Sequence, residues 1–196
     1  MNLPNKLTVI RIILTPIFML TLLWNFPFHY FVSLLIFIGA SLTDLFDGKI
    51  ARERGLVTDF GKFLDPLADK MLTTSAYLGF MFLYSAKTGS YGWQMTTIVF
   101  IVLFREFMVS SLRLVTAKSG LVVAANIWGK LKTVSQMVGL VVALFAYTLI
   151  SDFGLSQIEG VCDIIIMVLF WISAVLCVVS GLIYLNECKG YINTSK

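Results

Sequence analysis

Four aspartates at helical spacing form the clearest chemical pattern in the sequence. Asp44 and Asp47 are three residues apart and Asp65 and Asp69 are four apart, so each pair falls on one face of a helix. Four carboxylates in a small volume cannot all stay ionised without a counter-charge. A hard divalent cation such as Mg²⁺ supplies that charge through oxygen ligands and favours sharing with substrate phosphates. The spacing therefore predicts a metal site that also receives a phosphate-bearing substrate.

A second group of charged residues is mainly basic. Arg105 and Arg113 are eight residues apart, nearly two turns of one helix, and Lys130 and Lys132 open the next apolar segment. A helix N-terminus with basic residues is a natural phosphate site, so these four residues are candidates to bind a phosphorylated acceptor. In the alternative interpretation Arg105 pairs with Glu106 or an aspartate, and the two lysines contact anionic lipid.

The composition places these charges in a membrane protein. Of the 196 residues, 58% are hydrophobic and 13% are charged, whereas about a quarter are charged in soluble domains. Mean hydropathy is +0.89. This composition excludes a soluble globule, which needs a polar surface, and a disordered chain, which needs high charge. The net charge of +4 is spread among apolar segments rather than gathered on a polar face, so no nucleic-acid partner is expected.

Turn-forming residues divide the chain into six apolar segments, and about 20 residues suffice for each to cross a bilayer. Residues 25–29, which include Pro27, separate the first two segments, and residues 88–92 separate the third and fourth. The expected spans lie near 5–24, 30–54, 61–86, 92–117, 129–150 and 160–187. We therefore expect an all-α integral membrane protein with six transmembrane helices, forming a single domain over residues 1–196.

The distribution of basic residues predicts the orientation. With the N-terminus inside, all but one of the 15 Lys and Arg residues fall on the inner side, and Lys87 alone falls outside. Both termini, and the aspartates at the inner ends of spans two and three, are therefore expected to face the cytoplasm. A short loop joins these two spans, so we expect them to be antiparallel neighbours with Asp44 level with Asp69.

Three alternative roles for the aspartates stay open from the residues alone. The carboxylates could dock two helices through ion pairs with nearby basic residues, namely Lys49, Arg52, Lys62 and Lys70. They could also line the pathway of a divalent-cation transporter, or belong to a purely structural membrane subunit. Ionisable groups at membrane depth are costly to bury, which favours a functional role over a structural one.

Eight residues at fixed spacing form one string, Asp44-xx-Asp47-Gly48-xx-Ala51-Arg52, then eight residues, then Gly61-xxx-Asp65-xxx-Asp69. This string resembles the signature of the CDP-alcohol phosphotransferase family, and every fixed position is filled. In that family six transmembrane helices hold a metal site that faces the cytoplasm. A CDP-linked donor transfers its phosphatidyl group to an alcohol and releases CMP.

The resemblance implies roles for the residues of the string. The four aspartates, Asp44, Asp47, Asp65 and Asp69, would hold one or two divalent ions, Mg²⁺ or alternatively Mn²⁺. Asp69 would also be the general base that deprotonates the alcohol. The donor's CDP group would be bound by the other four residues of the string, Gly48, Ala51, Arg52 and Gly61. Arg52 has a competing interpretation as an anchor on the inner side of the membrane.

Three further segments, residues 2–11, 105–113 and 129–136, resemble the bacterial phosphatidylglycerophosphate synthases, a branch of the same family. This resemblance ends near residue 140. It implies that CDP-diacylglycerol is the donor and sn-glycerol 3-phosphate the acceptor, whose phosphate would bind Arg105, Arg113, Lys130 and Lys132. It also implies a homodimer in the bacterial plasma membrane. Enzymes that use inositol phosphate or serine are the nearest alternatives, and a serine acceptor would leave the basic residues unexplained.

Overall fold

The computed structural model describes residues 2–53, 58–87, 89–118 and 127–189, with the side chains of residues 3–4, 45–53, 59, 62–63 and 117–118 outside the described set. Its six long helices are α1 (Leu3–Leu23), α2 (His29–Glu53), α3 (Asp59–Ser85), α4 (Tyr91–Lys118), α5 (Ile127–Tyr147) and α6 (Glu159–Cys188). A π-helical turn η1 (Thr148–Asp152) and a 3-10 turn η2 (Ser156–Ile158) connect α5 to α6. The expected all-helical class and the six segments are confirmed, with each boundary close to its expected position.

Capping residues and turns explain where these helices begin and end. The Thr58 side chain caps α3 by accepting a hydrogen bond of 3.1 Å from the Gly61 backbone N–H. Between α3 and α4, Gly89 has a φ of +90°, a left-handed conformation that glycine adopts without a Cβ clash. Between α5 and α6, Gly154 has a φ of +74° and adopts the same left-handed conformation in the turn.

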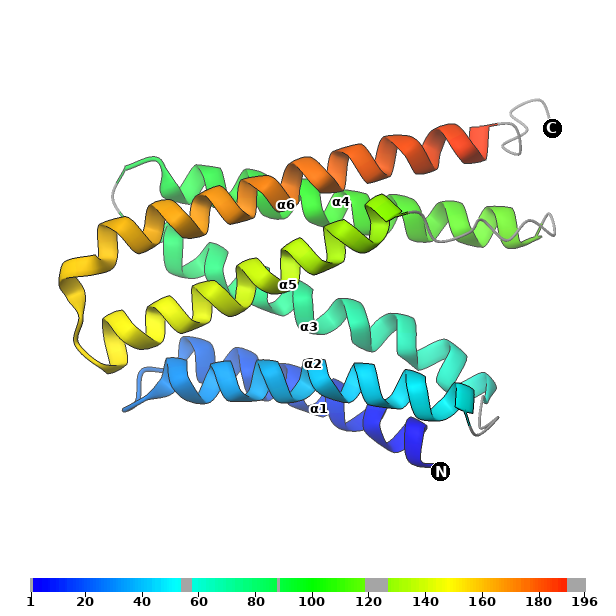
Figure 1. Cartoon of the computed structure of the whole chain (residues 1–196), viewed down its shortest axis with the longest axis horizontal. Helices are drawn as coiled ribbons and strands as arrows, with labels where there is room; N and C mark the ends of the chain where they lie inside the picture. The colour runs from blue at the N-terminus through cyan, green and yellow to red at the C-terminus, as the bar shows by residue number, and fades with distance from the viewer. Residues whose placement is uncertain (1, 54–57, 88, 119–126, 190–196) are drawn as a thin grey trace.

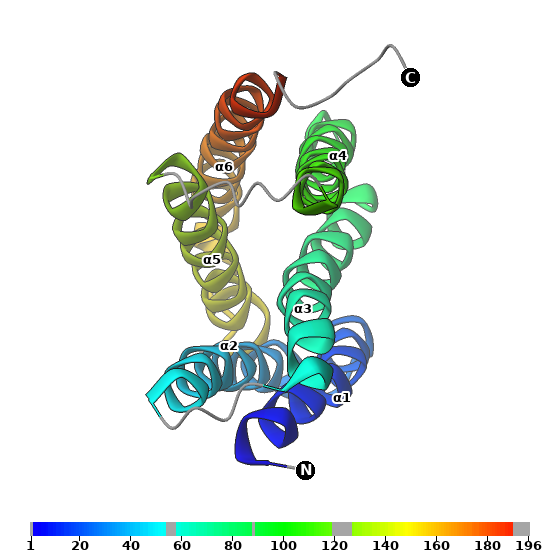
Figure 2. The ribbon, with the colours of Figure 1, turned by 90° about the vertical axis from the view of Figure 1, so that its right-hand side faces the viewer.

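The helices run back and forth along the long axis of the molecule (Figure 1). Helices α1, α3 and α5 begin, and α2, α4 and α6 end, at one common end, which we call the site end (Figure 1, right). Helix α1 packs extensively against both α2 and α3, and α6 packs against α4 and α5 (Figure 2). Within the described residues, α2 and α3 touch each other only slightly. The expectation that α2 and α3 are direct neighbours is therefore met only weakly, because α1 holds the two together.

Aromatic side chains fill the centre of the bundle. The rings of Phe80 and Phe170 lie 5.8 Å apart edge to face, and those of Tyr77 and Phe170 lie 5.2 Å apart. Such pairs add to the stability that burial alone gives. Many large apolar side chains on the outside of α1, α4 and α6 are exposed, as expected for a surface that faces lipid.

Among the described residues, three segments are long and apolar enough to cross a membrane, namely Asn5–Leu23, Ile127–Asp152 and Ser156–Cys188. The apolar part of α2, His29–Asp44, is shorter. Helices α3 and α4 are long, but charged residues such as Asp69 and Arg105 interrupt their apolar sequence. The protein is thus a helical membrane protein whose least apolar helices carry the charged residues.

An ion-pair cluster lies at the end of the bundle opposite the site end. The Lys87 ammonium group lies 2.7 Å from the Glu159 carboxylate and 2.5 Å from the buried carboxylate of Asp163. The Tyr84 hydroxyl donates a hydrogen bond of 2.9 Å to the same Asp163 side chain. Burial lowers the pKa of Lys87, but the hydrogen bonds to Asp163 and Glu159 outweigh that effect and raise it above the ordinary lysine value.

Replacing Lys87 with methionine is expected to destabilise the fold by about 3 kcal/mol, because the buried Asp163 charge loses its partner. The loss should appear as a lower thermal midpoint of the purified protein, and Lys87→Arg should retain most of the stability. Since the pKa of Lys87 is raised on folding, its contribution is complete below the ordinary lysine value and fades only as the pH rises above it. An unchanged midpoint in Lys87→Met would contradict this assignment.

Candidate active site

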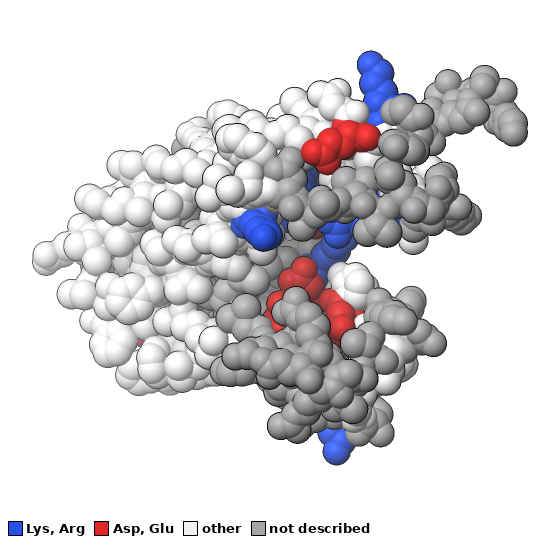
Figure 3. All heavy atoms as spheres, turned by 45° about the vertical axis from the view of Figure 1, so that its right-hand side comes forward, with Lys and Arg blue, Asp and Glu red and all other residues white. Residues whose placement is uncertain are grey.

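A cavity of about 600 Å³ at the site end is lined by carboxylates from two helices. Asp44 reaches it from α2, and Asp65 and Asp69 reach it from α3. The structure therefore brings three of the four predicted aspartates together, with Asp44 in the same cavity as Asp69. The side chain of Asp47, the fourth aspartate, lies outside the described residues. Figure 3 shows acidic side chains facing basic ones across a hollow in this part of the surface.

Helix α1 fixes the orientation of two of these aspartates. The Arg11 guanidinium, only 1% exposed, donates to Asp44 Oδ1 at 2.5 Å. One turn earlier, the Thr8 hydroxyl donates to Asp65 Oδ1 at 2.8 Å. At the start of α1, Asn5 Nδ2 donates to Thr58 Oγ1 at 2.9 Å and so ties α1 to the N-terminus of α3. Helix α1 therefore positions the carboxylates, a role that sequence reasoning missed.

A sequence signal for this role exists. Asn5, Thr8, Arg11 and Thr15 follow one another at intervals of three or four residues within an apolar helix, and all four are buried. That spacing is a polar stripe along one helix face. Such a stripe in a membrane helix must face a polar partner, which here is the pair α2 and α3.

Of the four residues expected to bind the CDP group, only Gly61 has its surroundings described. Gly61 is buried in the first turn of α3, where an added Cβ would lie 3.0 Å from Asn5 Oδ1 and 3.4 Å from Thr58 Oγ1. A side chain there would crowd the Asn5 and Thr58 side chains that join α1 to α3, so the glycine leaves room for this contact. The other three residues, Gly48, Ala51 and Arg52, lie in the last turns of α2, where the side chains are outside the described set.

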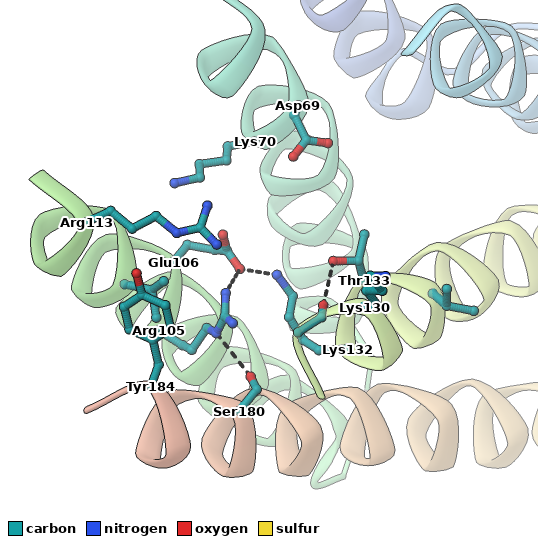
Figure 4. Close-up of a pocket in the computed structure, with 13 residues that line it drawn as sticks. Asp69, Lys70, Arg105, Glu106, Arg113, Lys130, Lys132, Thr133, Ser180 and Tyr184 are labelled. Atoms are coloured by element: carbon teal, nitrogen blue, oxygen red, sulfur yellow. Dashed lines mark hydrogen bonds and ion pairs between the residues drawn. The ribbon is translucent and has the colours of Figure 1, made fainter. Parts of the chain in front are cut away.

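A second cavity, of about 530 Å³, adjoins the first and is mainly basic (Figure 4). The four residues expected to bind the acceptor phosphate all line it, and they come from α4 and α5, namely Arg105, Arg113, Lys130 and Lys132. Asp69, Lys70 and Arg113 line both cavities. The candidate general base therefore lies at the junction between the carboxylate cavity and the basic cavity.

Glu106 organises the basic residues inside this second cavity. Its Oε1 atom accepts a hydrogen bond from Arg105 Nη1 at 3.3 Å and forms an ion pair with Lys132 Nζ. The pairing of Arg105 with Glu106, one of the alternatives open from the sequence, is thus present. Lys132 is only 6% exposed and does not face lipid, whereas Lys130 is exposed at the cavity edge. Two cations against one carboxylate leave this part of the cavity with a net positive charge.

Helix α6 also contributes to the basic cavity, which sequence reasoning did not foresee. Ser180 and Tyr184, one turn apart on α6, line the cavity together with the α4 residues (Figure 4). The resemblance to the synthases ends near residue 140, and for the span near 160–187 the sequence predicted only an apolar helix. The signal that could have found these residues is a serine and a tyrosine four positions apart on one face of an otherwise apolar helix.

The ligand atoms that line the carboxylate cavity suit a divalent metal ion. Asp44, Asp65 and Asp69 offer carboxylate oxygens, which Mg²⁺ and Mn²⁺ prefer. Among the described side chains, however, no three His, Cys, Asp or Glu residues are grouped closely enough to hold one ion. Asp47, three positions after Asp44 in α2, is the fourth carboxylate of the predicted set.

Comparison with known proteins identifies relatives of this chain by sequence. A sequence model of the family described as CDP-alcohol phosphatidyltransferase matches residues 1–179. A CDP-diacylglycerol–glycerol-3-phosphate 3-phosphatidyltransferase of Bacillus subtilis (strain 168) is 38% identical, over 99% of this chain and 98% of the relative. A protein of the same description from Rickettsia bellii is 36% identical over 97% of both chains. Another, from Haemophilus influenzae, is 32% identical over 96% of this chain and 94% of the relative.

Proposed function

The chain belongs to the CDP-alcohol phosphatidyltransferase family, and we propose that it transfers the phosphatidyl group of CDP-diacylglycerol to sn-glycerol 3-phosphate. The products are phosphatidylglycerol phosphate and CMP. The observation that carries this proposal is the position of Asp69, which lines both the carboxylate cavity and a basic cavity suited to a phosphate. Full-length relatives with this named activity support the choice of substrates.

The carboxylate cavity is proposed to receive the diphosphate of the donor. Asp44, Asp47, Asp65 and Asp69 would hold one or two divalent ions, whose charge offsets that of the diphosphate and of the leaving CMP. Arg11 and Thr8 hold two of these carboxylates in place, so less reorganisation is needed when the ligand binds. Gly48, Ala51, Arg52 and Gly61 remain the proposed contacts of the CDP group.

The basic cavity is proposed to bind the phosphate of the acceptor. Arg105, Arg113, Lys130 and Lys132 surround a space in which a dianionic phosphate would find several charge-assisted hydrogen bonds. A glycerol 3-phosphate held there by its phosphate would extend its terminal hydroxyl toward the junction at Asp69. An acceptor without a phosphate would leave these cations without a ligand.

The proposed chemical step is a displacement at phosphorus. Asp69 accepts the proton of the glycerol 3-phosphate hydroxyl as its oxygen attacks the phosphatidyl phosphorus. The bond from that phosphorus to the CMP oxygen breaks, and CMP leaves with the electron pair. Because the two cavities meet at Asp69, the attacking hydroxyl and the donor phosphorus can be placed beside one base.

The proposed topology puts all six helices of this single domain across a bacterial plasma membrane, with the site on the cytoplasmic side. The concentration of Lys and Arg on one side supports this orientation. Helices α1 and α6 have their chain ends at the site end of the bundle, which is consistent with cytoplasmic termini (Figure 1). The charged residues of α3 and α4 that line the two cavities would then lie at the cytoplasmic end of the bundle, namely Asp65, Asp69, Lys70, Arg105, Glu106 and Arg113. A homodimer is proposed from the family resemblance.

An acceptor panel tests the proposed function. The purified protein is reconstituted with CDP-diacylglycerol and Mg²⁺, and CMP release is measured with glycerol 3-phosphate, inositol phosphate or serine. We expect release with glycerol 3-phosphate alone. Release with inositol phosphate instead would keep the aspartate chemistry and overturn the choice of acceptor. No release with any acceptor, together with Mg²⁺ flux across sealed vesicles, would favour the transporter.

A further inference from the structure

Ser180 of α6 is positioned to orient one of the cations in the basic cavity. The side chain is buried, and its Oγ accepts a hydrogen bond of 3.2 Å from Arg105 Nε while donating one of 3.2 Å to the Cys177 carbonyl. Glu106 holds the same guanidinium through Nη1 at 3.3 Å. Arg105 is therefore fixed from two directions by residues of two helices.

The third nitrogen of Arg105 extends toward the beginning of α5. Its Nη2 atom lies 3.9 Å from where a Cβ on Gly129 would be, in the first turn of that helix. Helix N-termini favour anions because of their backbone N–H groups. Held by Ser180 and Glu106, the guanidinium lines the same cavity as this helix N-terminus.

Tyr184, one turn further along α6, has a buried hydroxyl at the cavity wall. Its side chain is 6% exposed, and the Arg113 guanidinium carbon lies 5.7 Å from the centre of its ring, a cation–π contact. The hydroxyl makes no hydrogen bond of normal geometry within the described part of the chain. The hydroxyl also interacts with the Cys188 thiol, but a thiol is only a weak hydrogen-bonding partner. A buried hydroxyl in this state is costly unless a ligand satisfies it.

We propose that Ser180 and Tyr184 complete the phosphate-binding site of the acceptor. Ser180 is a positioning residue that acts through Arg105, and the Tyr184 hydroxyl donates a hydrogen bond to a phosphate oxygen beside Arg113. This assignment rests on the proposed function, since it places the acceptor's phosphate in the basic cavity. The family model matches residues 1–179, so this assignment extends the site to two residues that follow the matched range.

The test is steady-state kinetics with Tyr184→Phe and Ser180→Ala, varying glycerol 3-phosphate at saturating CDP-diacylglycerol and Mg²⁺. Tyr184→Phe is expected to raise KM for glycerol 3-phosphate about tenfold, the effect of one hydrogen bond to a charged group. Ser180→Ala should raise it about threefold, and Ser180→Thr should restore it, because threonine keeps the hydroxyl. KM for CDP-diacylglycerol should be unchanged in all three variants.

Inorganic phosphate gives a readout that a merely structural role would not move. As a competitor of glycerol 3-phosphate, it should inhibit Tyr184→Phe about tenfold more weakly than the wild type. Matched controls are Tyr77→Phe and Ser173→Ala, which remove the same atoms from buried residues that line neither cavity. Both controls should keep the wild-type KM and the wild-type sensitivity to phosphate.

The outcomes separate this inference from the function on which it rests. A wild-type protein that releases no CMP with glycerol 3-phosphate overturns the proposed function. An active wild type combined with an unchanged KM and unchanged phosphate inhibition in Tyr184→Phe overturns the assignment of Tyr184 alone. A fall in kcat without a change in KM overturns it equally, since it indicates a role outside phosphate binding.

Discussion

Asp69→Asn is expected to lower the rate of CMP release from CDP-diacylglycerol and glycerol 3-phosphate about 100- to 10,000-fold, the range attributed to a general base. Asparagine has nearly the same shape but cannot accept the hydroxyl proton, and it offers a metal ion no negative charge. Because Asp69 lines both cavities, this one change affects the donor side and the acceptor side together. The measurement is the initial rate with both substrates saturating.

The matched control is Asp152→Asn, the same change at the opposite end of the bundle. Asp152 accepts a hydrogen bond of 2.7 Å from the Phe31 backbone N–H, which an asparagine side-chain oxygen can also accept. Its activity should stay close to that of the wild type. If Asp69→Asn were folded like the wild type and still retained more than a tenth of its rate, Asp69 would not be the base.

Removing divalent ions is expected to reduce CMP release to the background rate, and adding Mg²⁺ should restore it. Asp44, Asp65 and Asp69 bring negative charge to one cavity that must also receive an anionic diphosphate. Without an ion, repulsion between these charges opposes binding of the donor. Activity is measured in excess chelator, before and after titration with Mg²⁺. Full activity in excess chelator would exclude the proposed metal-dependent reaction.

The same ion should stabilise the folded protein in the absence of substrate. An ion that binds only the folded state adds about 2.7 kcal/mol when its concentration is 100 times its dissociation constant. The thermal midpoint of the wild type should therefore rise as Mg²⁺ is added. In Asp65→Asn the rise should be smaller, because one ligand has lost its charge. Equal rises in both proteins would place the ion elsewhere.

Local sequence determined the helical framework and the chemical class of the site. Pro27 and the residues around Gly89 interrupt the helices whatever lies next to them in space, so the segment boundaries could be predicted from the chain alone. The spacing of Asp65 and Asp69 likewise fixes their shared face, since the pitch of a helix is constant. The family signature added the reaction, and the relatives agree with it.

Only the tertiary structure decided what surrounds these residues. The Thr8–Asp65 and Arg105–Ser180 hydrogen bonds join positions 57 and 75 residues apart, so no local spacing encodes them. A short loop between α2 and α3 suggested direct packing, but loop length limits only the distance between helix ends. Which helix fills the space between two others depends on the shapes of all the facing surfaces. Helix packing therefore decided that α1 orients the carboxylates and that α6 completes the basic cavity.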